Sequence, residues 1–206
     1  MSGVRLVLYS DFLCPWCWNA ATRLAAVQDA LGPALAIEFR SYLLRATPQP
    51  GRDLERFRAY TQSWLRVAED EPRAPLRPWV GDAGPPSHSL PPHVVAKGAA
   101  ALSAEAGAAL RDRLFRAYFA ESRDITDDAT LRALWREAGL APADYDAIDT
   151  AAHARAARAE HAEAQSLGAT GVPAVRLADQ DFVLVGAQPE AVYLRWLTRA
   201  LEAARA

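Results

Sequence analysis

The two cysteines of the 206-residue chain, Cys14 and Cys17, lie together in residues 10–18, which read SDFLCPWCW. Two thiols separated by two residues can bind a metal ion, form a structural disulfide or act as a redox couple. A structural zinc site takes four ligands, and no second cysteine pair accompanies this one. Among the histidines, His88 and His93 alone approach the spacing of a zinc finger, and they lie in a proline-rich stretch. We therefore expect no metal site.

The length and the charge of the chain exclude further roles for the cysteine pair and for the protein. A chain of this length buries roughly 70% of its unfolded-state surface, so it needs no disulfide to stay folded. The net charge of −2 provides no basic surface for nucleic acid. No apolar run approaches the roughly 18 residues that a membrane span needs. We expect neither nucleic acid nor membrane as a partner.

The first residues, MSGVRLVLYSDF, bear on the compartment of the protein. They contain one basic residue and a short apolar run, which leaves no room for a secretory signal before the cysteine motif. We therefore expect a cytoplasmic protein. Structural disulfides are rare in that compartment, and paired thiols there are catalytic, redox-sensing or metal-binding.

The elements around the cysteines can be inferred from the hydrophobic periodicity. Residues 4–9 form a short apolar run typical of a strand that is buried on both faces. Apolar or small residues then recur at steps of three and four over residues 15–31, which predicts a helix that ends at Gly32-Pro33. Residues 35–40 alternate between apolar and other side chains as in a strand. The cysteine pair thus lies at the junction between a strand and a helix.

The C-terminal residues predict two strands and a helix. Residues 173–177 and 181–185 read as short strands separated by three residues, which is the length of a hairpin loop. Pro189 suits the first turn of a closing helix, because its missing N–H costs nothing there.

The region between these two ends contains no confident strand. Residues 72–92 include seven of the fourteen prolines, which predicts a long ordered loop or a lid. Thr126-Asp127 can cap the third of four helix candidates. These candidates cover residues 52–69, 110–120, 130–138 and 150–167.

This order of elements, β-α-β, helices and then β-β-α, is that of an α/β thioredoxin-like fold interrupted by a large helical insertion. We expect residues 1–45 and 166–206 to form the thioredoxin-like domain and residues 46–165 to form the all-helical insertion. Such a fold places the start of the first helix beside the turn that precedes Pro173. It therefore brings together two motifs that are about 155 residues apart.

The cysteine motif fits redox chemistry at each of its positions. Cys14 lies at the N-terminus of the helix, where unpaired N–H groups and the helix dipole favour the thiolate, which is the nucleophile. Cys17 lies one turn further along and begins the buried stripe, so we expect it to be shielded and to act as the resolving thiol. We expect Cys14 to be exposed. Pro15 fixes the backbone between the thiols. Trp16 either offers an exposed apolar contact or covers the disulfide, and Trp18 packs in the core.

Two further features belong to the expected site. Asp11 either relays a proton to the Cys17 thiol or caps the strand–helix turn, and we favour the cap because the sequence shows no sign of burial. In Gly171-Val172-Pro173, an X-Pro bond opens a strand after a flexible residue, which suits a cis peptide but leaves a trans proline open. The backbone of Val172 could pair with an extended substrate that approaches Cys14.

Taken together, these motifs resemble the DsbA-like thioredoxin superfamily, and within it the cytoplasmic FrnE-like group that is related to 2-hydroxychromene-2-carboxylate isomerase. The resemblance rests on four stretches of this sequence. They are Asp11-x-x-Cys14-Pro15-Trp16-Cys17-Trp18, Gly171-Val172-Pro173-Ala174-Val175, Gly186-Ala187-Gln188-Pro189 and Ala117-Tyr118-Phe119-x₄-Asp124-Ile125.

The resemblance implies a protein thiol–disulfide oxidoreductase. Cys14 would be its nucleophile, Cys17 its resolving thiol and Pro173 a cis proline that touches substrate next to Val172. It implies no bound cofactor, with glutathione as a candidate redox partner beside protein dithiols and disulfides. The isomerase relatives have serine at the position of Cys14, so the two cysteines of this chain favour disulfide chemistry.

Two alternatives stay open, as do the direction of exchange and the oligomeric state. One is a glutathione-dependent isomerase or transferase for a small organic molecule. The other is a non-catalytic holdase or redox sensor.

Overall fold

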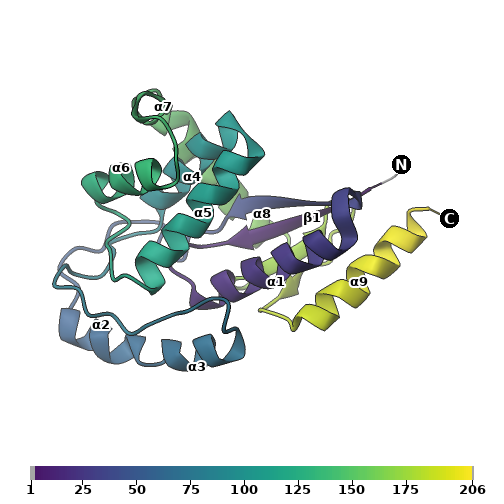
Figure 1. The fold of residues 1–206 in the computed structure, drawn as a ribbon, viewed down its shortest axis with the longest axis horizontal. Helices are drawn as coiled ribbons and strands as arrows, with labels where there is room; N and C mark the ends of the chain where they lie inside the picture. The colour runs from purple at the N-terminus through teal and green to yellow at the C-terminus, as the bar shows by residue number, and fades with distance from the viewer. Residues whose placement is uncertain (1–2, 206) are drawn as a thin grey trace.

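A mixed four-stranded sheet forms the centre of the molecule (Figure 1). The structure is a computed structural model that describes residues 3–205. The strands are β1 (Val4–Ser10), β2 (Leu35–Ser41), β3 (Ala174–Leu177) and β4 (Leu184–Val185), and their order in the sheet is β2-β1-β3-β4. β2 is parallel to β1, whereas β3 is antiparallel to both β1 and β4. The thioredoxin-like order of elements is thus confirmed.

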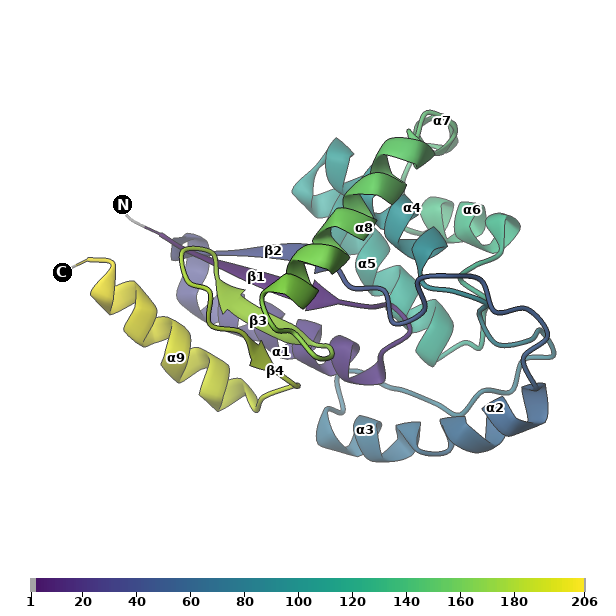
Figure 2. The same cartoon turned by 180° about the vertical axis from the view of Figure 1, so that it is seen from behind.

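Helices cover both faces of this sheet. α1 (Pro15–Leu31) and α9 (Glu190–Ala203) pack against one face, where Leu6 and Leu8 of β1 lie fully buried. α8 (Thr150–Ser166) lies across the other face, against Val7 and Tyr9 (Figure 2). β1 is therefore buried on both faces, as its continuous apolar run predicted.

The remaining helices form a cluster beside the sheet that also contacts α1 and α8 (Figure 1). Its core is aromatic, and it joins the sheet part through Trp18 of α1, which stacks on Phe115 and Phe119 at centroid distances of 6.2 and 6.0 Å. The expectation that Trp18 packs in the core is confirmed. The helices are α2 (Leu54–Thr61), α3 (Trp64–Asp70), α4 (Leu90–Leu102), α5 (Ala104–Phe119), α6 (Asp128–Glu137) and α7 (Pro142–Asp146).

The structure corrects one helix prediction and one loop prediction. Residues 52–69 do not form one helix, because the chain leaves α2 after Thr61, whose hydroxyl donates to Arg58 and accepts from the backbone N–H of Trp79. The proline-rich segment lacks helix and strand as far as Ser89, but α4 begins within it at Leu90. Prolines are tolerated in a first turn, where their missing N–H has no partner to lose. Asp127 caps α6 as expected, accepting from the N–H of Thr130 at 2.8 Å.

The C-terminal hairpin is also smaller than expected. β4 contains two residues instead of the five in 181–185. The guanidinium of Arg176 donates to the carbonyl oxygens of Ala178 and Gln180, which lie in the loop between β3 and β4. Pro189 precedes α9 as its N-cap and does not lie in the first turn. The proposed boundary between sheet and insertion stays a prediction, since α8 contacts both β2 and α4.

Candidate active site

The two cysteines lie at the start of α1, close enough to react with each other. Cys14 is the N-cap residue, and Pro15 occupies the first turn of the helix. The N–H of Cys17 donates to the carbonyl oxygen of Cys14 at 3.1 Å, so the turn between the two residues is closed. Their side chains lie 3.2 Å apart as free thiols. This geometry is that of a dithiol that can form a disulfide across one helical turn.

The two thiols differ in their surroundings, although less in burial than expected. Cys17 is fully buried, and burial together with the neighbouring Cys14 raises the pKa of its thiol well above the usual range. Cys14 was expected to be exposed, but its exposed fraction is only 5%. The segment at Val172 covers it, and the Cys14 thiol donates to the Val172 carbonyl oxygen at 3.4 Å.

Strand pairing explains how Val172 reaches a residue 158 positions earlier. Tyr9 of β1 pairs with Ala174 of β3, so the chain just before β3 lies level with the end of β1, where the cysteine segment begins. The Val172-Pro173 peptide bond is cis. The carbonyl oxygen of Pro173 accepts from the N–H of Gly186 at 2.7 Å. Hydrogen bonds to Cys14 and to Gly186 thus fix the turn at Val172-Pro173, and Val172 faces Cys14.

Asp11 occupies the interior of this site, which corrects the assumption that it is not buried. Its two carboxylate oxygens accept from the N–H of Leu13 at 2.7 Å and of Leu44 at 2.6 Å. Its own N–H donates to Cys17 Sγ at 3.5 Å. Burial raises its pKa to about 6. Asp11 therefore orders the turn, as favoured from the sequence, and also has an ionisation close to neutral pH.

A hollow of about 630 Å³ opens beside Cys14. Trp16 lines it and is partly buried, and Tyr60 of α2 lines it with 56% of its surface exposed. Leu44 and Arg66 complete the lining from the loop after β2 and from α3. Tyr60, Leu44 and Arg66 were not predicted from the sequence, because the loop after β2 and the helices α2 and α3 reach Cys14 only in the folded chain.

The histidines do not gather at the cysteines. His161 instead contacts the loop after β2, where its Nδ1 accepts from the N–H of Leu43 at 3.2 Å and its ring packs edge-on against Tyr42. Within residues 3–205, no group of three or more His, Cys, Asp or Glu side chains is arranged to hold a metal ion.

None of the described helices combines the length and the apolar character that crossing a bilayer requires.

Comparison with known proteins shows what this arrangement is similar to. A family model described as the DSBA-like thioredoxin domain matches residues 5–197. No curated protein matches the chain. The solved structures include a probable DsbA oxidoreductase, SCO1869 from Streptomyces coelicolor. It is 31% identical over 96% of this chain and 89% of its own, with a TM-score of 0.74.

Two further solved structures are informative. Cytosolic disulfide reductase DsbM from Pseudomonas aeruginosa is 26% identical, with 98% of each chain covered and a TM-score of 0.74. It has also been solved with glutathione. A 2-hydroxychromene-2-carboxylate isomerase is 17% identical over 95% of each chain, with a TM-score of 0.64, and at that identity the likeness extends to the fold alone.

Proposed function

The chain belongs to the DSBA-like thioredoxin domain family, and on that premise we propose that it is a thiol–disulfide oxidoreductase with Cys14 as nucleophile and Cys17 as resolving thiol. The observation that carries the proposal is the pair of free thiols 3.2 Å apart at the start of α1. A hollow opens beside Cys14, whereas Cys17 is enclosed. Of the two cysteines, only Cys14 lines the hollow, so Cys14 is the one that a substrate in the hollow would meet first.

In the reducing direction, exchange takes two steps. The Cys14 thiolate attacks one sulfur of a substrate disulfide, which forms a mixed disulfide and releases the other substrate sulfur as a thiolate that takes up a proton. Cys17 then loses its proton and attacks the Sγ of Cys14. This second attack releases the substrate as a dithiol and leaves a Cys14–Cys17 disulfide, so two electrons pass from protein to substrate. Oxidation of a substrate is the reverse.

The surrounding residues support these steps without reacting themselves. The dipole at the start of α1 stabilises the attacking thiolate of Cys14. The N–H of Asp11 donates to Cys17 Sγ and so favours the charge that develops on that sulfur during resolution. We assign to Val172 and Pro173 the role of substrate contact, because the Val172 carbonyl already accepts from Cys14. Pro15 and Trp16 shape the rim of the hollow.

Glutathione is the small thiol that we propose as redox partner, with no other cofactor. The support is the similarity to DsbM, a cytosolic disulfide reductase solved with glutathione, together with the cation of Arg66 at the hollow. The same similarity supports a cytoplasmic location and a role on protein or small-molecule disulfides. Disulfide reduction by glutathione is the direction we favour for a cytoplasmic protein.

Trapping of the mixed disulfide tests the proposal directly. The Cys17→Ser variant, mixed with a disulfide-containing peptide, should accumulate a covalent adduct on Cys14 that mass spectrometry detects and dithiothreitol releases. The double variant Cys14→Ser/Cys17→Ser is the control and should form none. An adduct-free Cys17→Ser variant that is folded, together with a wild-type protein inactive in insulin reduction, would rule the proposal out.

The isomerase and the holdase alternatives make different predictions for the same variants. A glutathione-dependent isomerase retains its turnover in Cys17→Ser, because it needs one activating group at position 14 and no resolving thiol. A holdase suppresses aggregation equally well in the double variant. The exchange enzyme loses multiple turnover in both single variants, because each half of the reaction requires a thiol.

A further inference from the structure

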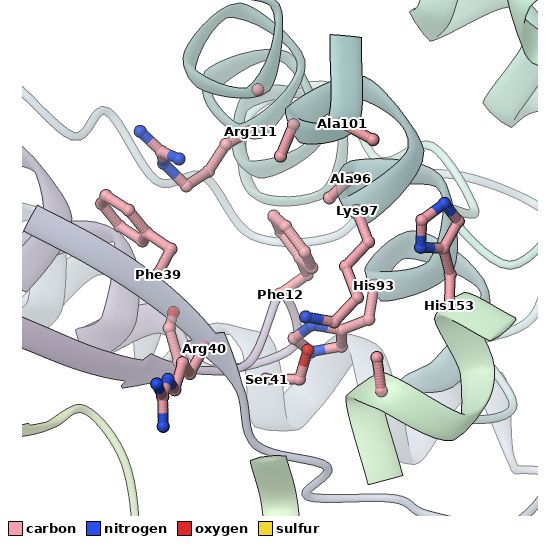
Figure 3. Close-up of a pocket in the computed structure, with 14 residues that line it drawn as sticks. Phe12, Phe39, Arg40, Ser41, His93, Ala96, Lys97, Ala101, Arg111 and His153 are labelled. Carbon is pink, nitrogen blue, oxygen red and sulfur yellow. The ribbon is translucent and has the colours of Figure 1, made fainter. Parts of the chain in front are cut away.

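A second cavity, of about 360 Å³, shares a wall with the cysteine segment but is lined by neither cysteine. It lies between the ends of β1 and β2 and the helices α4, α5 and α8 (Figure 3). Phe12 and Phe39 form its aromatic walls, and alanines of α4 line the opposite side. Most of its surface is therefore apolar, which is typical of a pocket for a small organic molecule.

The charges around this cavity are all positive, but two of the three are already neutralised. Arg40 binds two glutamates, and the Nζ of Lys97 lies 2.6 Å from a carboxylate oxygen of Glu160. Arg111 of α5 differs from both. Throughout residues 3–205, no side chain or carbonyl forms a hydrogen bond or an ion pair with its guanidinium. Arg111 thus has no bonded counter-ion among the described residues, and only the charge of the adjacent Asp112 acts on it at the edge of the cavity.

The position of Arg111 suits it to bind a carboxylate. Its guanidinium lies over the ring of Phe39, 3.4 Å from the centroid, which fixes its plane (Figure 3). Burial lowers its pKa to about 10, so it remains charged at neutral pH. An enclosed cation gains most from a partner that is also removed from water, and the planar guanidinium can hold a carboxylate by two parallel hydrogen bonds.

A second unsatisfied group, His93 of α4, lines the same cavity. Its side chain is 5% exposed, and its Nε2 has no hydrogen-bond partner among the described residues. The ring also bonds to the backbone carbonyl of Tyr42, and burial lowers the pKa of His93 to about 3, so the imidazole is neutral. A neutral imidazole that donates from one nitrogen accepts at the other. Nε2 therefore lacks a donor.

We propose that this cavity binds a small organic acid with an apolar body. Its carboxylate pairs with Arg111, and a hydroxyl or N–H group at its other end donates to His93. Phe12 lies between these two side chains and packs against the apolar body (Figure 3). No covalent step is involved. The site is independent of thiol exchange, because Cys14 and Cys17 do not line it.

The test is calorimetric titration of the full chain with 3-(4-hydroxyphenyl)propionate. We expect one saturable site, at least tenfold weaker binding of the methyl ester and several-fold weaker binding of 3-phenylpropionate, which lacks the hydroxyl. Arg111→Gln should weaken binding of the acid at least tenfold. Arg116→Gln is the matched control, since Arg116 is an exposed arginine of the same helix paired with Asp112, and it should leave binding unchanged.

Two more variants separate this site from a general loss of structure. Ala96→Leu should fill the cavity and abolish binding while its thermal unfolding stays close to that of the wild type. Cys14→Ser should bind the acid as the wild type does. Absence of binding to the folded wild type overturns the proposal. So does equal binding of acid and ester, equal binding by Arg111→Gln, or loss of binding in Cys14→Ser.

Discussion

The hollow beside Cys14 and the cavity at Arg111 lie at the two ends of residues 10–16, but they differ in whether their polar groups have hydrogen-bond partners. In the hollow, the reactive thiol of Cys14 has a partner in the Val172 carbonyl. In the cavity, Arg111 and the Nε2 of His93 have none among the described residues. A thiol that reacts covalently can form a hydrogen bond in the free protein, because the disulfide bond to the substrate later replaces that hydrogen bond. At a non-covalent site, polar groups that have no partner in the free protein can form their hydrogen bonds with the ligand, and this contributes to the affinity.

The largest expected effect comes from removing the nucleophile. Cys14→Ser should lower thiol–disulfide exchange at least 100-fold, because a serine hydroxyl is not ionised near neutral pH and forms no disulfide. Binding of the organic acid at Arg111 should stay within twofold of the wild type. Insulin reduction and calorimetry, run on the same preparation, measure both. A parallel loss of the two activities would mean that the hollow and the cavity are one site.

Asp11 should make the cysteine side of the segment sensitive to pH. Burial raises its pKa from 3.8 to about 6, so the folded state binds this proton more tightly than the unfolded state. Its contribution to stability is therefore fully present below pH 4 and is lost as the pH rises through 6. A rise in pKa from 3.8 to about 6 corresponds to a contribution of about 3 kcal/mol to the free energy of unfolding.

Urea unfolding of wild type and Asp11→Asn between pH 4 and pH 7 measures this contribution. The free energy of unfolding of the wild type should fall relative to that of the variant by roughly 2.5 kcal/mol over this range, because asparagine does not titrate. Parallel pH profiles would show that Asp11 is solvated and that its raised pKa is absent in solution.

Phe12 is the wall that the cavity shares with the cysteine segment, and its substitution should affect the two sides unequally. Its ring packs against His93 at 4.9 Å and Phe115 at 5.0 Å. Phe12→Leu should cost about 1 kcal/mol of stability and weaken binding of the acid three- to fivefold, while exchange stays within twofold. Phe182→Leu, at a ring that is 66% exposed, is the control and should change none of these. Exchange that falls more than acid binding would reverse the assignment.

The smallest effect is expected at the rim of the hollow. Arg66→Gln should raise the KM for glutathione two- to threefold at low salt, and the difference should vanish at high salt, because Arg66 is exposed and its charge is screened. Arg56→Gln, an exposed arginine on α2 outside the hollow, should leave the KM unchanged. Steady-state kinetics at two ionic strengths distinguish the variants. A KM that responds equally to both would assign the effect to net charge.

The sheet part of the fold follows closely from local patterns. The helix predicted over residues 15–31 coincides with α1, and the parallel pairing of β1 with β2 follows from the β-α-β order. These elements are recognisable because each buries a face along its whole length, so its apolar residues repeat at the period of the element. The helices of the insertion were located less well. α4 begins among prolines, and the break after Thr61 depends on a hydrogen bond from Trp79, 18 residues away.

The sequence by itself determined that two thiols lie one turn apart at the start of a helix, because that arrangement needs only local geometry. The burial of Cys14 under Val172, the enclosure of Asp11 and the union of Arg111 with His93 were decided by the tertiary structure alone. Each of these features depends on residues that are distant in the chain. Burial, pKa and the lack of a hydrogen-bond partner are set by the neighbours of a residue in space, which the order of residues along the chain does not reveal.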